Sequence, residues 1–134
     1  MPMTMNERPL SPHLQIYKVE LPMMLSGLHR ITGIALSVGS LLLVAWIESA
    51  VYSAEAFATL SRFLGSFIGQ LMLFGWTFSL IYHSVSGVRH LIWDTGKLLE
   101  VAQIHSSSKF VLSITIVLTL LVWILGGGFP GGIS

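Results

Sequence analysis

The chain has 134 residues, of which 53% are hydrophobic and only 10% are charged, and its mean hydropathy is +0.78. Soluble domains carry about 25% charged residues, so this chain has too few to cover a surface that faces water, and intrinsic disorder is excluded as well. The formal net charge of +1 indicates no nucleic acid partner. Because cysteine is absent, the chain holds no disulfide and no cysteine-bound metal or iron–sulfur cluster. The composition therefore predicts a small integral membrane protein.

The first 22 residues are polar and contain four of the five prolines. They lack the basic start, short apolar run and small-residue cleavage site of a signal peptide. We therefore predict that residues 1–22 form a segment on the membrane surface, extended or partly helical.

Three stretches without charged residues follow, at 31–47, 63–88 and 110–134. A membrane-spanning helix needs about 20 mainly apolar residues, and Pro22 fits the first turn of a helix. These features predict helices at about 23–52, 62–94 and 108–127, the last ended by a glycine-rich tail. The expected fold is a single all-α domain over residues 1–134 with three transmembrane helices.

Basic residues lie mainly on one side of these predicted spans. Six of the seven are expected on the side of the N-terminus and the second loop: Arg8, Lys18, Arg30, Arg89, Lys97 and Lys109. Only Arg62 lies on the other side. Because Lys and Arg are enriched in cytoplasmic segments, we expect the N-terminus to be cytoplasmic, or to face the matrix in a mitochondrion.

The second predicted helix carries ionisable residues where they are costly in a membrane and usually functional. At 100° per residue, His83, Gly87, His90 and Asp94 fall on one stripe of the helix. Gly87 leaves room for a flat or bulky group to approach the backbone. By the helical rise, His83 lies roughly 10 Å deeper in the membrane than His90.

The first predicted helix carries a matching polar group in the same leaflet. Ser26, His29 and Arg30 are spaced i, i+3 and i+4, so they share a face. A neutral histidine deep in a helix bundle, such as His83, suits an axial ligand of an iron porphyrin. No second deep histidine is present, so we expect the other ligand to come from another chain.

The basic rim suits the propionates of such a porphyrin, with His29, Arg30, Arg89 and His90 as candidates. Ser26 and Arg30 could also hold the carbonyl oxygens of a quinone, and Asp94 could relay protons.

Simpler roles remain open for the same residues. His83 could hydrogen-bond a neighbouring helix, Arg30 could reach to the interface and set topology, and Ser26 could pack helices together. For the whole chain, two alternatives remain. One is a haem-free transport or assembly subunit with a His83, His90 and Asp94 proton relay, and the other is a structural anchor that has lost its haem.

Three segments resemble motifs of one known family, in the family's order. They are RPLSPHLQIY at residues 8–17, SGLHRITG at 26–33 and HSVSGVRHLIWD at 83–94. Together they resemble the signatures of the cytochrome b large membrane-anchor subunit of succinate dehydrogenase, or respiratory complex II.

The resemblance implies a membrane anchor for a flavoprotein subunit and an iron–sulfur subunit, beside a second, smaller anchor subunit. Electrons from succinate would pass through this complex to ubiquinone. By motif position, His83 would be an axial ligand of haem b, with the second histidine from the other anchor. His29, Arg30 and His90 would contact the haem, and Ser26 and Arg30 would bind quinone.

Asp94 would lie in the polar surroundings of the site as a candidate proton relay. The chain would then be one subunit of an oxidoreductase and not a catalyst by itself. Because no presequence is evident, we expect the bacterial inner membrane rather than the mitochondrial one.

Overall fold

The computed structural model describes residues 16–127, and the regular secondary structure within this range is all α-helical. The four helices are α1 (Leu21–Tyr52), α2 (Ala54–Gly65), α3 (Phe67–Asp94) and α4 (Val101–Leu125). By length and composition, α1, α3 and α4 can each cross a membrane. The predicted all-α architecture with three spanning helices is therefore confirmed. Most of the predicted surface segment at 1–22 lies outside the described residues, and the side on which the N-terminus lies stays a prediction.

The predicted second helix, 62–94, is wrong at its start because the chain breaks into α2 and α3 at Ser66. Ser66 has an extended backbone, with φ −71° and ψ 162°. Its hydroxyl accepts a hydrogen bond from the N–H of Gly69 at 3.2 Å, which satisfies a free donor at the start of α3. Gln70 Nε2 donates to the carbonyl oxygen of Leu64 at 3.0 Å and holds the two helix ends together.

The predicted third helix, 108–127, is also displaced, because α4 begins seven residues earlier and ends at Leu125. At its start, Gln103 Oε1 accepts a hydrogen bond from the backbone N–H of Glu100 at 3.4 Å. This side-chain cap stabilises the start of α4. It allows the polar residues 101–107, which the sequence pattern assigned to a loop, to form the first two turns of the helix. The predicted first helix, 23–52, agrees more closely with the structure. Helix α1 begins two residues earlier, at Leu21, with proline in its first turn, and it ends at Tyr52, as predicted.

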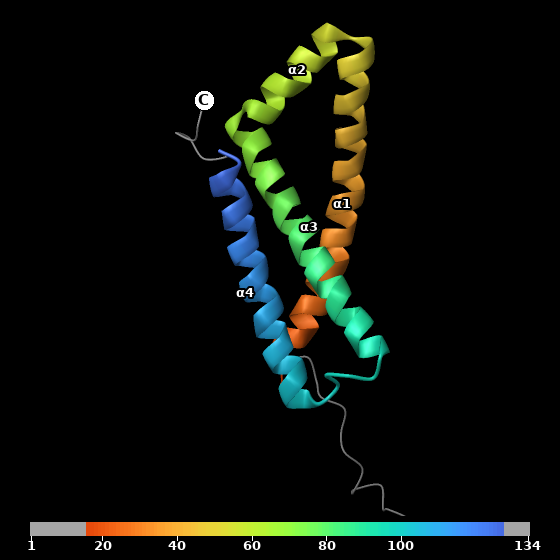
Figure 1. The fold of residues 1–134 in the computed structure, drawn as a ribbon, viewed down its shortest axis with the longest axis vertical. Coiled ribbons are helices and arrows are strands. Elements are labelled where there is room, and N and C mark those ends of the chain that lie inside the picture. Colours follow the sequence, from red (N-terminus) through yellow and green to blue (C-terminus); the bar gives the residue numbers. More distant parts are fainter. Residues whose placement is uncertain (1–15, 128–134) are drawn as a thin grey trace, which may run out of the picture.

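The helices cross rather than run parallel (Figure 1). Helices α1 and α3 cross and then diverge, and α2 bridges their separated ends, whereas α4 runs along α3. At the opposite end, where α1 and α4 begin and α3 ends, the three spanning helices pack together; we call this the closed end. Its buried core contains Leu25, Tyr82 and Val111, one from each helix. The hydroxyl of Tyr82 donates to the carbonyl oxygen of Leu25 at 2.7 Å and links α3 to α1.

Small hydroxyl side chains form the buried face of α4. Ser108, Thr115 and Thr119 are at most 1% exposed, and each donates to the carbonyl oxygen of the residue four positions earlier. Because these hydroxyls are satisfied within their own helix and are small, α4 can approach α3 closely without burying an unpaired polar group. At the far end of the pair, Phe74 packs edge-on against Trp123, with ring centroids 5.3 Å apart.

Candidate functional site

Three histidines from α1 and α3 lie together near the closed end; we call them the histidine cluster. The ring of His29 stacks on the ring of His83, with centroids 4.0 Å apart and planes 7° from parallel. The ring of His90 lies 5.0 Å from that of His29. All three side chains are half-buried. The crossing of α1 and α3 therefore brings together the histidines of the two helices.

The hydrogen bonds of His83 determine which of its ring nitrogens carries the proton. Its Nδ1 lies 3.1 Å from the carbonyl oxygen of His29 and 3.3 Å from the hydroxyl of Thr32. That hydroxyl already donates its proton to the same carbonyl oxygen at 2.9 Å. Both neighbours can then only accept, so Nδ1 must be the donor. In a neutral imidazole, Nε2 is left with a free lone pair.

Gly33 lets the His83 ring approach α1 closely. A Cβ added at Gly33 would lie 3.2 Å from Cε1 of His83, which is tighter than ordinary packing. Sequence reasoning assigned no role to Thr32 or Gly33, although both follow His29 in the motif at 26–33. Their position three and four residues after His29, on the same helix face, was the signal that could have revealed them.

Gly87 has the opposite surroundings. A Cβ added there would meet no described atom within 4 Å, although the residue is half-buried. Packing within the described part of this chain therefore does not require a glycine at this position. The space beside Gly87, on the stripe between His83 and His90, is open to a group from outside the chain.

The other predicted site residues lie at the edge of the histidine cluster or away from it. Ser26 and Arg30 are exposed on α1, whereas His29 between them is half-buried against α3. Asp94 is the last residue of α3 and is exposed. The predicted stripe therefore places His83 and His90 at the cluster, and Asp94 at the exposed helix end beyond it.

Arg89 lies in the α3–α4 interface. It is 4% exposed, and its Nη1 donates to the Ser108 hydroxyl at 2.9 Å. Its guanidinium carbon lies 4.6 Å from the centre of the Trp93 ring, a distance at which a cation is attracted to the ring face. This arginine therefore joins α3 to α4 and does not form part of the exposed rim on α1.

Two observations show what kind of ligand the histidine cluster suits. Nδ1 of His29 is buried and has no hydrogen-bond partner among the described residues. Leaving such a group unpaired costs about 1–3 kcal/mol, so a partner from outside the chain is expected.

Among the described residues, no group of three His, Cys, Asp or Glu side chains could hold a metal ion. A metal here would therefore take single imidazoles and need its remaining ligands from elsewhere.

Three apolar spanning helices, with a histidine cluster where α1 and α3 cross, define a small multi-pass membrane protein. The family described as succinate dehydrogenase/fumarate reductase transmembrane subunit matches residues 4–122. The chain belongs to this family.

Named relatives agree with this assignment. The chain is 42% identical over 118 residues to a succinate dehydrogenase cytochrome b556 subunit of Paracoccus denitrificans, a match that covers 88% of this chain and 91% of the relative. It is 34% identical over 119 residues to the cytochrome b556 subunit of Rickettsia felis, covering 89% and 93%. It is also 42% identical over 111 residues to the mitochondrial cytochrome b560 subunit of Bos taurus, covering 81% of this chain and 66% of that longer relative.

Proposed function

We propose that this chain is a membrane-anchor subunit of a succinate:quinone oxidoreductase, which binds haem b and contributes to the site of ubiquinone reduction. Family membership supports the anchor role, and the cytochrome names of the relatives support a haem. The single observation that carries the haem proposal is the free lone pair on Nε2 of His83. That atom is suited to bind iron because Nδ1 is committed to Thr32 and the His29 carbonyl oxygen.

His83 would hold the haem iron together with a histidine from a second small anchor subunit. When bound, the haem supplies a one-electron carrier between the redox centres of the complex. The hydrogen bonds that Nδ1–H donates hold the imidazole in one orientation and raise its basicity. His29, Arg30 and His90 hold the propionates, which fits the unpaired Nδ1 of His29. The open space beside Gly87 leaves room for the flat edge of the porphyrin.

Ser26 and Arg30 bind the quinone head group. A hydroxyl and a guanidinium can each donate a hydrogen bond to a quinone carbonyl oxygen. Both side chains are exposed on α1, so another subunit must close the site over them, and the iron–sulfur subunit is the partner we propose. Reduction of ubiquinone to ubiquinol consumes two electrons and two protons, and Asp94 at the exposed end of α3 is positioned to pass protons inward.

The remaining assignments concern partners and location. We assign the succinate chemistry to a flavoprotein subunit, as the resemblance of the sequence motifs implies. The N-terminus and the α3–α4 loop face the cytoplasm, following the distribution of basic residues. The bacterial inner membrane is the proposed location, which the relatives from Paracoccus and Rickettsia support.

Purification in a mild detergent tests this function directly. We expect a tagged chain to copurify with a flavoprotein, an iron–sulfur protein and a second small membrane protein. We also expect the dithionite-reduced complex to show the α-band of a b-type haem. A complex with the same partners and no α-band would support the structural anchor without haem. A chain without these partners and without haem would support the transport or assembly subunit with a histidine and aspartate proton relay.

Replacing Thr32 with valine tests whether its hydroxyl controls the electronic state of the His83 imidazole. Valine keeps the shape and loses one acceptor for Nδ1–H, so the ligand becomes a weaker donor and the reduced haem is favoured. We expect the haem midpoint potential to rise by less than about 59 mV. For a one-electron couple, that value corresponds to a tenfold change in the equilibrium constant of reduction. Redox titration of the α-band measures this. Thr32→Ser keeps the hydroxyl and serves as the control, and equal potentials in all three proteins would contradict the assignment.

A further inference from the structure

Two consecutive residues of α3 bind the backbone of one turn of α1. The hydroxyl of Tyr82 donates to the carbonyl oxygen of Leu25 at 2.7 Å. Nδ1 of His83 donates to the carbonyl oxygen of His29 at 3.1 Å. Because Leu25 and His29 are four residues apart, these two oxygens lie about one helical turn from each other along α1. We call the two hydrogen bonds, from Tyr82 and from His83, the paired clamp.

Tyr82 is the fully buried member of the paired clamp. Its side chain is 0% exposed, and its ring lies in the same core as Leu25 and Val111. Within α1, the carbonyl oxygen of Leu25 also accepts the backbone N–H of His29, and a carbonyl oxygen has two lone pairs. The Tyr82 hydroxyl therefore binds the second lone pair. Since Leu25 is only 3% exposed, water has little access to replace this hydroxyl.

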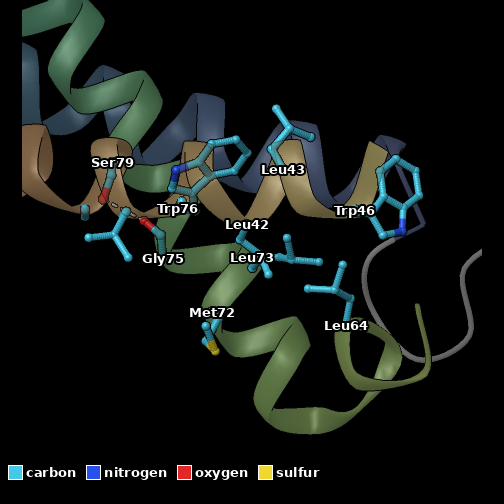
Figure 2. Close-up of a pocket in the computed structure, with 12 residues that line it drawn as sticks. Leu42, Leu43, Trp46, Leu64, Met72, Leu73, Gly75, Trp76 and Ser79 are labelled. Atoms are coloured by element: carbon cyan, nitrogen blue, oxygen red, sulfur yellow. Dashed lines mark hydrogen bonds between the residues drawn. The ribbon is translucent and has the colours of Figure 1, made fainter. Parts of the chain in front are cut away.

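Beyond the paired clamp, α1 and α3 move apart towards α2. Figure 2 shows the hollow of about 880 Å³ that lies between them, lined on α1 from Ala35 to Trp46 and completed by α3 and by Leu64 of α2. Among the described residues, every hydrogen bond that joins α1 to α3 is made by Tyr82 or His83. The position of the first turns of α1 relative to α3 therefore depends directly on the paired clamp.

The turn of α1 that the clamp holds also carries Ser26. This serine follows Leu25 directly, and successive side chains in a helix point about 100° apart. Leu25 therefore packs in the core while Ser26 is exposed on the surface of α1. A displacement of the Leu25 backbone would move the Ser26 hydroxyl with it. Hydrogen bonds weaken steeply when their geometry departs from linear, so the position of this turn affects any bond that Ser26 makes to a ligand.

We propose that Tyr82 is a positioning residue for the quinone site, acting through its hydrogen bond to Leu25 to place the Ser26 hydroxyl. This inference rests on the proposed function, in which Ser26 binds the quinone. Tyr82 does not contact the quinone itself, because its hydroxyl is buried and donates to Leu25. The proposed haem ligand His83 is the next residue of α3, so neighbouring side chains serve the two proposed sites.

Tyr82→Phe removes the hydroxyl and keeps the aromatic ring in the core. The variant is purified as the complete complex, and its KM and kcat are measured with decylubiquinone, beside dye activity and the haem spectrum. We expect the KM for the quinone to rise roughly three- to tenfold, as fits the loss of one neutral hydrogen bond. The kcat, the dye activity and the haem spectrum should stay at wild-type levels, because only quinone binding is weakened.

Val111→Ala is the matched control, because Val111 lies in the same buried core and has no polar side-chain group. This variant loses packing but no hydrogen bond to α1, so its KM for decylubiquinone should equal that of the wild type. A lower kcat and dye activity at an unchanged KM in Tyr82→Phe would show a merely structural role and would contradict the inference.

A double-mutant cycle with Ser26→Ala shows whether Tyr82 acts through Ser26. We expect Ser26→Ala to raise the KM, and Tyr82→Phe to cause no further increase in that background. A wild-type KM in Tyr82→Phe, or effects of the two changes that multiply, would overturn the positioning role alone. A wild-type KM in Ser26→Ala would instead remove Ser26 from the proposed quinone site, and the inference would fall with it.

Discussion

Replacing His83 with alanine will abolish the b-type haem absorbance of the purified complex. His83 is the one histidine in the described spans whose Nδ1 is held by both a backbone carbonyl oxygen and a hydroxyl, which leaves Nε2 free to bind iron. His29 and His90 lie beside it, and both are proposed to hold the propionates. Loss of the imidazole should therefore remove one of the two proposed iron ligands. The dithionite-reduced minus oxidised spectrum measures the effect, with haem content determined separately after extraction.

His105→Ala is the matched control for this experiment. His105 lies on α4, outside the histidine cluster, and its Nε2 is 3.4 Å from the carboxylate of Glu20. Because that pair is partly exposed, its removal should lower the free energy of unfolding by about 1 kcal/mol or less. The haem spectrum should therefore stay at the wild-type level. Full haem content in the His83 variant would contradict the ligand assignment. Equal haem loss in both variants would point to general instability instead.

Replacing Arg30 with alanine will lower electron transfer from succinate to quinone while activity with an artificial dye is retained. Dyes accept electrons before the quinone site, so they report on the flavoprotein and iron–sulfur subunits alone. A hydrogen bond from a charged donor is worth about 1.5–3 kcal/mol. Its loss should therefore lower the rate of electron transfer to quinone by roughly 10- to 100-fold. Ser26→Ala removes a neutral hydrogen-bond donor and should lower the activity with quinone by about tenfold or less. The ratio of quinone to dye activity measures both effects.

Lys109→Ala is the control for the loss of a basic residue in this part of the chain, because Lys109 is exposed on α4 and is assigned no role in the site. It should keep the wild-type activity ratio. Haem content is measured alongside, since Arg30 is also proposed to contact a propionate. A parallel fall in quinone and dye activity for Arg30→Ala would indicate failed assembly. An unchanged activity ratio would exclude the arginine from the quinone site.

Several features of this protein could be predicted from the sequence because they depend on local composition. A spanning helix is defined by a run of apolar residues, so three such helices were expected, and residues 16–127 contain three. The end of α1 at Tyr52 and the end of α3 at Asp94 agree with the predicted limits. The break at Ser66 was missed because it lies inside an uncharged run and depends on the Ser66 cap and the Gln70 bond to Leu64. Hydropathy does not detect either of these bonds.

The sequence by itself thus determined the membrane class, the three spans and the candidate ligand His83. The tertiary structure decided which atom of His83 is free, because Thr32 and the His29 carbonyl oxygen lie 51 and 54 residues away along the chain. It also placed Arg89 against Ser108 and opened the hollow between α1 and α3. Helical periodicity shows which residues share a face of one helix. Only the crossing of two helices shows which faces meet and where they separate.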